Sequence, residues 1–315
     1  MKATIFVSFI LLVSFVTSEI DDCSRDYSDD GGNGHFAISG ADEDIKAPWL
    51  AAVGIGRENN EFFSLCSGTI ITKKFILTAA HCWKHPIYKP THVRAGANDI
   101  NYFFIEQKEI LNVKKHPDYD DSGSEIYYFD IAIIELVEEF KFTSRIYPIC
   151  LPEFSSRHPG NDIGITVQGW GESDEGKGKG KEVSQVSVSV RSRFECDERI
   201  GMFGKSSSPR SGNVEKWMPQ LTTDVLFCAD ANLNIKKGVC NGDSGGPAIR
   251  RFDKFMNIFL GTLSNLTSFF SRKYVDGRSR YFLIGIVTGN VNYCEGGLPD
   301  VYNFIGNDKV KTSST

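Results

Sequence analysis

The first candidate for chemistry is a serine enclosed by glycines, in the octet Cys240-Asn241-Gly242-Asp243-Ser244-Gly245-Gly246-Pro247. Acyl transfer needs a nucleophilic hydroxyl together with backbone N–H groups that point at the developing oxyanion. Because glycine adopts backbone conformations that other residues avoid, the amides of Gly242 and Ser244 are able to converge on one point. A glycine-rich turn with an incidental serine explains the same octet, so the interpretation needs support from elsewhere in the chain.

A serine hydroxyl is a weak nucleophile unless a base takes its proton, and histidine, with a pKa near 6.5, suits that task at neutral pH. Of the six histidines, His81 is the candidate, because it follows Leu77-Thr78-Ala79-Ala80 and precedes Cys82. Small apolar residues and a cysteine would fix the strand end that carries it. The other histidines lie in polar or proline-containing stretches and are predicted to be surface or loop residues: His35, His85, His92, His116 and His158.

The third requirement is a buried carboxylate that holds the imidazole tautomer and stabilises the imidazolium. Asp130 precedes the apolar run Ile131-Ala132-Ile133-Ile134-Glu135-Leu136. Its charge is therefore directed towards a hydrophobic strand, where it is costly unless it is paired. An aspartate before a strand is ordinarily a cap or a turn residue, but here His81 is a candidate partner.

The elements that must position these residues are predicted to be strands. Short runs rich in β-branched and aromatic residues alternate with turn formers, and helical periodicity is scarce: Trp49 to Ile55, Gly68 to Leu77, Phe103 to Val113, Ile131 to Leu136 and Ile163 to Gly169. Val183 to Val190 alternates apolar and polar residues, which places one face on a core and the other in water. We expect an all-β sandwich or barrel, with the mature chain forming one large domain or two adjacent ones.

Three polar stretches interrupt the strand pattern. The basic, glycine-rich run from Gly176 to Lys181 and the segment from Gly204 to Gly212 are expected to be solvated loops. The stretch 250–281 contains Asn265-Leu266-Thr267, a glycosylation sequon expected on an exposed loop.

The N-terminal residues favour export. Lys2, an apolar run from Ala3 to Val16 and small residues ending at Ser18 predict a signal peptide over residues 1–18. The run is shorter than the roughly 20 apolar residues needed to span a bilayer, so no membrane anchor is expected. Residues 19–36 hold six acidic residues and one arginine, are glycine-rich at their end, and are predicted to be a flexible pro-segment.

The net charge of −5 resides almost entirely in that acidic segment. The remainder of the chain is close to neutral, so nothing indicates a nucleic-acid partner. The eight cysteines are an even number in a chain with an export signal, which favours disulfides. They are scattered singly, without the close Cys/His pairs of structural zinc sites, so no metal site is predicted.

Together, the three segments, in the order His81, Asp130, Ser244, resemble the chymotrypsin and trypsin family of serine peptidases. The resemblance runs from about Ala37 to Ile305 and includes further landmarks: Pro48-Trp49, Ile149-Cys150-Leu151-Pro152, Gly169-Trp170-Gly171, Gly285-Ile286-Val287-Thr288 and Pro299-Asp300-Val301-Tyr302. The family implies two packed antiparallel six-stranded β-barrels with the active site between them. Residues 37–155 would form the first barrel and residues 156–315 the second.

The resemblance also implies a disulfide pattern, one of 105 pairings of eight cysteines: Cys66 with Cys82, Cys196 with Cys228, Cys240 with Cys294, and Cys23 with Cys150. The last pair would tether the acidic pro-segment. The family further implies protein or peptide substrates, an activating protease and protein inhibitors as partners, no cofactor, and a secreted, extracellular enzyme.

Family members are activated when a new α-amino group pairs with the aspartate beside the nucleophile, here Asp243, and so orders the oxyanion hole. The segment that resembles the mature start is His35-Phe36-Ala37-Ile38-Ser39-Gly40, which predicts cleavage after Phe36 and a terminus at Ala37. This junction lacks a Lys or Arg, and Ala37 is smaller than the usual bulky residue. Either an enzyme that cuts after aromatic residues activates the chain, or activation is weak or placed differently.

The substrate pocket departs from trypsin. By resemblance it is lined by Gly238, Val239, Thr288, Asn290 and Asp300, and Gly238 stands where trypsin has its acidic residue. Asp300 replaces a usual glycine. Its carboxylate would either reach the pocket floor and favour Lys or Arg, or point into solvent.

The sequence therefore predicts an endopeptidase in which Ser244 attacks, His81 is general base and then acid, and Asp130 orients His81. The pocket suggests a Lys/Arg preference or a broad one. A non-catalytic homologue that binds a partner is the alternative. The unusual junction favours it, as does Gly289 in the place of the pocket tryptophan that the family usually has, and the intact triad opposes it.

Overall fold

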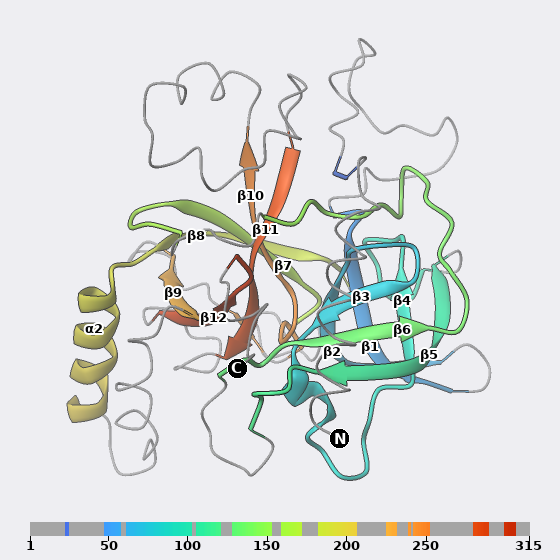
Figure 1. The fold of residues 1–315 in the computed structure, drawn as a ribbon, viewed down its shortest axis with the longest axis horizontal. Helices are drawn as coiled ribbons and strands as arrows, with labels where there is room; N and C mark the ends of the chain where they lie inside the picture. The colour runs from blue at the N-terminus through green and yellow to red at the C-terminus, as the bar shows by residue number, and fades with distance from the viewer. Residues whose placement is uncertain are drawn as a thin grey trace.

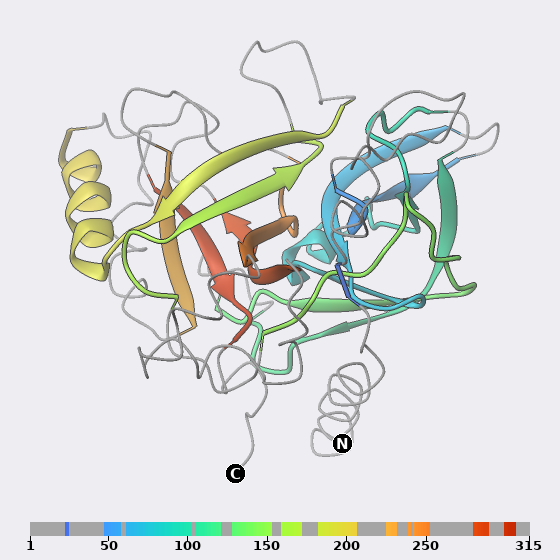
Figure 2. The same ribbon diagram turned by 90° about the horizontal axis from the view of Figure 1, so that it is seen from above.

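The computed structural model consists of two strand-rich halves that lie side by side (Figures 1 and 2). It describes residues 23–24, 47–57, 61–102, 105–120, 128–152, 159–171, 182–206, 225–231, 239–240, 242–252, 280–289 and 299–306. The predicted signal peptide lies outside these residues, as does the pro-segment except for Cys23 and Ser24.

The first half is a closed antiparallel barrel in the order β1-β2-β3-β6-β5-β4. Its strands are β1 (Leu50–Gly56), β2 (Phe62–Ile70), β3 (Phe75–Thr78), β4 (His92–Ala95), β5 (Glu106–Lys115) and β6 (Ala132–Leu136). A short 3-10 helix, η3 (Ala80–Trp83), follows β3 directly. It carries His81 out of the barrel wall.

The second half is a closed antiparallel barrel in the order β10-β11-β12-β9-β8-β7. Its strands are β7 (Gly164–Gly169), β8 (Ser184–Val190), β9 (Leu226–Asp230), β10 (Pro247–Phe252), β11 (Arg280–Gly289) and β12 (Asp300–Phe304). The predicted architecture, two antiparallel six-stranded barrels, is confirmed. Closing both sheets leaves no unpaired edge along either barrel.

Alternation in β8 shows why the sequence pattern succeeded. Val188 and Val190 are buried, whereas Gln185 and Ser187, on the opposite face, are exposed. One face of the strand therefore contributes to the core and the other meets water, as a period of two requires.

One predicted run proved to be two strands. Gly68 to Leu77 contains the end of β2, a turn and β3. The Thr72 hydroxyl accepts the backbone N–H groups of Lys74 and Phe75, at 3.2 and 3.0 Å, and so closes the turn. Thr72 and the two lysines that follow it supply the turn signal that the apolar residues on either side obscure.

The helix α2 (Arg193–Ser206), at the outer edge of the second barrel, was not predicted (Figure 1). Its start has a sequence signature nonetheless, the spacing Ser192-x-x-Glu195. Ser192 Oγ accepts the Glu195 N–H at 3.3 Å, and Glu195 Oε2 accepts the Ser192 N–H at 2.9 Å. This reciprocal pair is a capping box, which satisfies backbone donors that the first helical turn leaves free.

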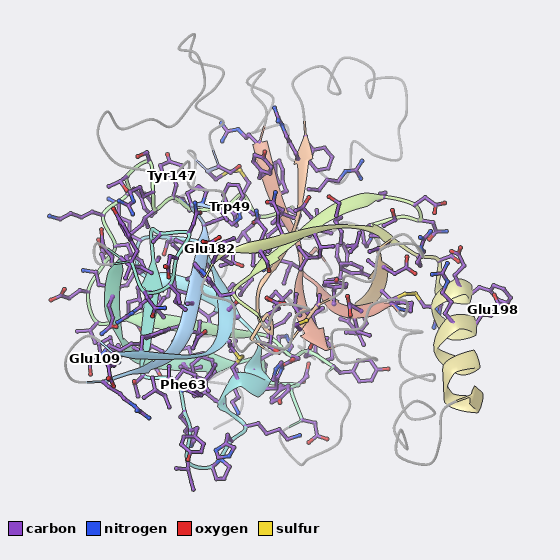
Figure 3. All side chains as sticks on the ribbon, turned by 180° about the vertical axis from the view of Figure 1, so that it is seen from behind. Trp49, Phe63, Glu109, Tyr147, Glu182 and Glu198 are labelled. Atoms are coloured by element: carbon purple, nitrogen blue, oxygen red, sulfur yellow. A yellow bond between two sulfur atoms is a disulfide. The ribbon has the colours of Figure 1, made fainter. Side chains whose placement is uncertain are left out.

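The two barrels share a core and several polar contacts. Trp49 lies where they meet (Figure 3), and its Nε1 donates to Gln168 Oε1 of β7 at 2.9 Å. In the opposite sense, Trp170 Nε1 donates to the carbonyl of Asn98 at 2.9 Å. Each barrel therefore satisfies a buried indole of the other, which fixes their relative position.

Three of the four expected disulfides are present between described residues: Cys23–Cys150, Cys66–Cys82 and Cys196–Cys228. Cys240 is also disulfide-bonded, and its expected partner, Cys294, lies outside the described residues. The tether at Cys23 is reinforced because Ser24 Oγ accepts the Tyr281 N–H at 2.7 Å and donates to the Tyr281 carbonyl at 2.8 Å.

The capping box yields a stability prediction. Replacing Ser192 by Ala removes the acceptor for the Glu195 N–H, and we expect a loss of about 1 kcal/mol in the free energy of unfolding. Ser192→Asp should restore most of it. Urea unfolding under non-reducing conditions measures the change. Ser187→Ala, an exposed serine of β8, is the matched control, and an equal loss in both variants would contradict a capping role.

Candidate active site

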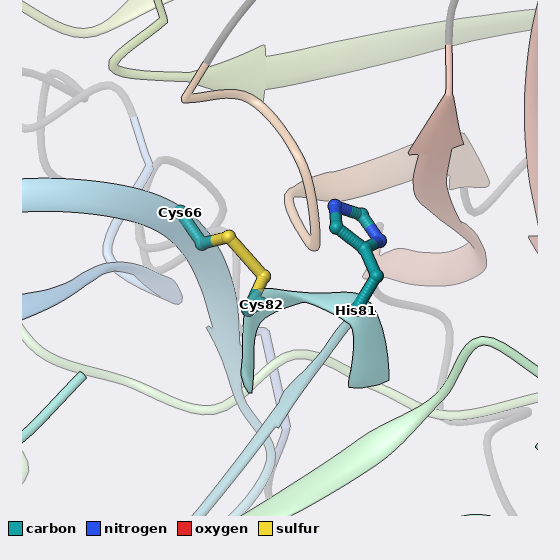
Figure 4. Close-up of side chains that lie close together, drawn as sticks. All are labelled: Cys66, His81 and Cys82. Atoms are coloured by element: carbon teal, nitrogen blue, oxygen red, sulfur yellow. A yellow bond between two sulfur atoms is a disulfide. The ribbon is translucent and has the colours of Figure 1, made fainter. Parts of the chain in front are cut away.

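His81 projects from η3 beside the Cys66–Cys82 disulfide, which joins this turn to β2 (Figure 4). The preceding Ala79 and Ala80 are fully buried, so the turn is packed against the barrel as its apolar sequence suggested. The His81 N–H donates to Asp130 Oδ1 at 2.7 Å, and the ring Nδ1 lies 2.6 Å from Asp130 Oδ2. Because a carboxylate only accepts, Nδ1 carries the ring proton and Nε2 is left as the basic nitrogen.

Asp130 has no exposed surface. Its carboxylate accepts the two donors of His81 and, on Oδ2, the hydroxyl of Thr288 from β11. A buried carboxylate is tolerable only when hydrogen bonds or charges replace its water. Thr288 had been predicted as a pocket residue, but its hydroxyl is committed to Asp130, and nothing in the local sequence indicated this contact.

The backbone before Asp130 is unusual. Phe129 has a φ of 50°, in the left-handed region that bulky residues rarely adopt. Its ring stacks on that of His116, with centroids 4.7 Å apart and planes at 9°. His116, predicted as a surface or loop residue, is buried, and its N–H donates to the Ile131 carbonyl at 2.8 Å. These contacts hold the turn from which the Asp130 side chain enters the barrel junction.

Ser244 is half-buried at a turn that enters β10. Gly242 and Gly245 have φ values of 98° and 81°, so the turn uses the freedom that glycine provides. At Gly245 a Cβ would lie 2.2 Å from Thr78 Oγ1, which excludes any side chain there. The Gly245 N–H donates to the Val287 carbonyl at 2.8 Å and ties the turn to β11.

The three predicted segments meet at one place. The Ser244 carbonyl accepts the Ser67 N–H at 2.8 Å and lies 4.0 Å from the Sγ of Cys82, the residue after His81. Within the described residues, the amides of Gly242 and Ser244 donate no hydrogen bond to another protein group.

Asp243 points away from the turn into the second barrel. Its carboxylate accepts the N–H groups of Cys240 and Gly171, at 2.9 and 2.7 Å. A Cβ on Gly171 would lie 2.3 Å from Asp243 Oδ2, so the glycine makes room for the carboxylate. Burial raises the pKa of Asp243 to about 6, against the opposing effect of the two hydrogen bonds. Its predicted partner, Ala37, lies outside the described residues.

Asp300, at the start of β12, is 5% exposed and does not point into solvent. Its Oδ2 accepts the N–H of Val239 at 3.0 Å. Burial, together with the negative charges of Asp243 and Asp230, raises the pKa of Asp300 to about 8. The carboxyl thus faces the segment that precedes Cys240. Two other predicted pocket residues, Gly238 and Asn290, lie outside the described residues, as does the sequon at Asn265.

Cys66, His81 and Cys82 form the one group among the described residues whose ligand atoms lie close enough to hold a metal ion (Figure 4). The two sulfur atoms are joined in a disulfide and are not thiolates, so they are not metal ligands. Among the described residues, no helix combines the length and apolar character needed to cross a membrane.

Comparison with known proteins agrees with the fold. The chain is 31% identical to clotting factor C of Tachypleus tridentatus over 64% of its own length and 19% of that protein. It is 28% identical to the serine proteinase stubble of Drosophila melanogaster (90% and 34% covered) and 33% identical to the venom serine protease Bi-VSP of Bombus ignitus (64% and 52%). The chain thus spans between about a fifth and a half of these relatives.

Among solved structures, neuropsin, a serine protease expressed in the limbic system of mouse brain, has the same fold. The TM-score is 0.57 at 20% identity, with 83% of this chain and 91% of neuropsin covered. The family model described as Trypsin matches residues 38–307. On this match and the double barrel, the chain is a member of the trypsin family, the chymotrypsin-like serine peptidases.

Proposed function

We propose that this chain is a secreted serine endopeptidase that hydrolyses peptide bonds with Ser244, His81 and Asp130. The observation that carries the proposal is the pair of hydrogen bonds between His81 and the fully buried Asp130, with the Ser244 turn anchored beside them. A carboxylate that is buried against a histidine stabilises the imidazolium that forms when the histidine takes a proton. Few purely structural roles require that arrangement next to a half-exposed serine.

The chemistry follows from the positions of the three side chains. Ser244 Oγ bonds to the substrate carbonyl carbon, its proton passes to His81 Nε2, and the carbonyl π electrons move onto the oxygen. The amides of Gly242 and Ser244 donate to that oxyanion. When the intermediate collapses, the C–N bond breaks and His81 gives its proton to the leaving amine. Water then attacks the acyl-enzyme with His81 again acting as base, which releases the acid and restores Ser244.

Activation is proposed to involve Asp243. Its carboxylate is buried, carries a raised pKa, and accepts only neutral backbone donors among the described residues. An ammonium group at Ala37, created by cleavage after Phe36, would pair with it and stabilise the ionised form. The absence of Lys or Arg at this junction points to an activating protease that cuts after aromatic residues.

Substrate preference is proposed to rest on Asp300. Val239, whose N–H binds the Asp300 carboxyl, immediately follows Gly238 in the segment that the family uses for its primary pocket. A carboxyl at that floor favours a Lys or Arg side chain at the cleaved bond, since a cation both neutralises it and lowers its pKa. Gly289 and Asn290 stand where the family usually has a Trp-Gly pair in the pocket wall, which would alter the entrance.

The setting is proposed to be extracellular. The relatives include a clotting factor and a venom serine protease, and the N-terminal sequence has the features of a signal peptide over residues 1–18. Protein substrates, an activating protease and protein inhibitors would be the partners. The Cys240–Cys294 bridge, glycosylation at Asn265, and barrel limits of 37–155 and 156–315 belong to the same proposal.

A non-catalytic homologue is the competing function. The Phe36-Ala37 junction favours it, because the Ala37 side chain would fill the activation pocket less completely than the usual bulky residue. The absence of the usual pocket tryptophan at Gly289 favours it as well. Such a protein would keep the double barrel and bind a partner without turnover.

The triad predicts selective labelling by a fluorophosphonate, which reacts rapidly only with a serine activated by its base. We expect labelling of the secreted, processed protein and none of Ser244→Ala. Asp130→Asn should lower kcat by about 10⁴-fold, since His81 would then be held in the wrong tautomer, with its proton on Nε2. Ser187→Ala is the control. Wild-type protein that stays unlabelled while trypsin reacts beside it would favour the non-catalytic homologue.

The position of Asp300 predicts a pH-dependent preference. In the enzyme without substrate, the Asp300 carboxyl is protonated below its pKa of about 8. Above that pH the carboxylate is negatively charged and attracts a Lys or Arg side chain. We expect the ratio of kcat/KM for Lys and Arg substrates over Leu substrates to rise about tenfold or more from pH 6.5 to pH 9. Asp300→Asn should abolish the rise, whereas Asp162→Asn, an exposed aspartate of the same barrel, should preserve it. A wild-type enzyme without preference for Lys or Arg would exclude this role.

Asp243 predicts that rising pH lowers the stability of the unprocessed chain and that processing removes this effect. Its raised pKa means that the folded, unprocessed chain holds a proton that the unfolded chain loses, so stability falls as pH rises from about 4 to about 6. The loss is about 3 kcal/mol for a shift of this size.

Thermal unfolding of the unprocessed wild type and of Asp243→Asn, measured between about pH 4 and about pH 6, tests this loss of stability. The variant should not show it. In the processed protein the Ala37 ammonium lowers the pKa, and the wild type should no longer lose stability relative to the variant. N-terminal sequencing establishes the processed form. A start other than Ala37 would remove the activation argument.

A further inference from the structure

Ser67, a fully buried residue of β2, contacts the Ser244 turn with both its backbone and its side chain. Its N–H donates to the Ser244 carbonyl at 2.8 Å, and its hydroxyl donates to the Gly242 carbonyl at 2.9 Å. Its own carbonyl accepts the Thr78 hydroxyl at 2.7 Å. Ser67 belongs to the first barrel, whereas Gly242 and Ser244 belong to the second, so this serine joins the barrels at the proposed oxyanion donors.

The hydrogen bond from the Ser67 hydroxyl matters because of the peptide unit to which the Gly242 carbonyl belongs. That carbonyl and the Asp243 N–H belong to one planar peptide unit. The Asp243 N–H donates to the Cys240 carbonyl at 3.0 Å, within the second barrel. Within the described part of the chain, Ser67 Oγ is the sole hydrogen-bond partner of the Gly242 oxygen. The peptide unit is therefore held at one end by each barrel.

Gly242 is the residue in this turn whose orientation needs such support. Its φ of 98° is open to glycine, which adopts alternative φ and ψ values at little steric cost. The Gly242 N–H belongs to the preceding peptide unit, which meets the Gly242–Asp243 unit at the Gly242 Cα. If the carbonyl of Gly242 were released, the two units would be free to reorient about the φ and ψ bonds of Gly242, and the Gly242 N–H would change direction. An oxyanion donor acts only when it is aimed at the developing charge before the reaction.

We propose that Ser67 is a positioning residue, whose hydroxyl fixes the Gly242–Asp243 peptide and thereby aims the Gly242 amide at the transition-state oxyanion. This inference rests on the proposed peptidase function and adds a residue to it. Ser67 touches neither substrate nor the reacting atoms. Its effect passes through the turn, from the first barrel to the second.

The same strand supplies a matched control. Thr69 lies two residues further along β2, is equally buried, and its hydroxyl has no hydrogen-bond partner among the described residues. Thr69→Val therefore removes a buried hydroxyl of β2 without breaking a contact to the Ser244 turn. Ser67→Ala and Ser67→Gly both remove the Ser67 hydroxyl and leave its N–H in place, so an effect common to both variants comes from the hydroxyl.

The test compares two inhibitors that share one peptide sequence. A peptide aldehyde adds to Ser244 Oγ, and its carbonyl oxygen then occupies the oxyanion position, whereas the matched peptide alcohol binds without forming that bond. We expect Ser67→Ala and Ser67→Gly to weaken the aldehyde about tenfold and to leave the alcohol unchanged, with kcat about tenfold lower and KM unaltered. Removing an oxyanion donor outright costs 10²- to 10³-fold, and misaiming one should cost less.

The outcomes separate this inference from the proposed function. Wild type that is labelled by the fluorophosphonate and binds the aldehyde more tightly than the alcohol supports the peptidase. If the Ser67 variants of that active enzyme then lose affinity for both inhibitors equally, or match Thr69→Val in every measurement, the positioning role is wrong. Wild type that neither reacts nor prefers the aldehyde overturns both. Melting temperatures, measured for each variant, identify any that has failed to fold.

Discussion

The complete burial of the Asp130 carboxylate is the constraint on which the arrangement around it depends. A charge without water needs donors, and the three that it receives come from two segments far apart in the chain, η3 and β11. The first barrel must deliver His81, and the second must deliver Thr288, to within hydrogen-bond distance of the Asp130 carboxylate. The relative position of the barrels is thus tied to an electrostatic requirement as well as to packing.

Contacts between the barrels meet this requirement at several points. Trp49 donates to Gln168 and Trp170 donates to Asn98, so each barrel satisfies an indole of the other. Ser67 makes a contact of the same kind with the Ser244 turn, because its N–H and hydroxyl donate to two carbonyls of the opposite barrel. The site is therefore a property of the junction, because neither barrel alone contains a complete set of donors and acceptors.

Asp243 and Asp300 are buried acids of a different kind. Both have raised pKa values, and the structure provides each with backbone donors and no cation among the described residues. In the function proposed here a cation arrives later, as the Ala37 ammonium for Asp243 and as a substrate side chain for Asp300. Because neither carboxyl group is neutralised in the folded chain, each would gain from binding its cation, and this gain would drive activation at Asp243 and substrate choice at Asp300. The same lack of a cation lowers the stability of the folded chain at neutral pH.

The sequence by itself determined the strand-rich fold and the three segments around His81, Asp130 and Ser244, because these depend on local residue types, alternation and order. The candidate partners of the cysteines came from the resemblance of those segments to a known family. The capping box at Ser192 was visible too, although the helix that it begins was missed. Only the tertiary structure decided that Thr288 binds Asp130, 158 residues away, and that Ser67 binds Gly242, 175 residues away. It also decided that Asp300 turns inward and that His116 is buried under Phe129. The sequence does not show whether a short polar side chain binds water or a carbonyl group. Its partner depends on which strands become neighbours when the two barrels close.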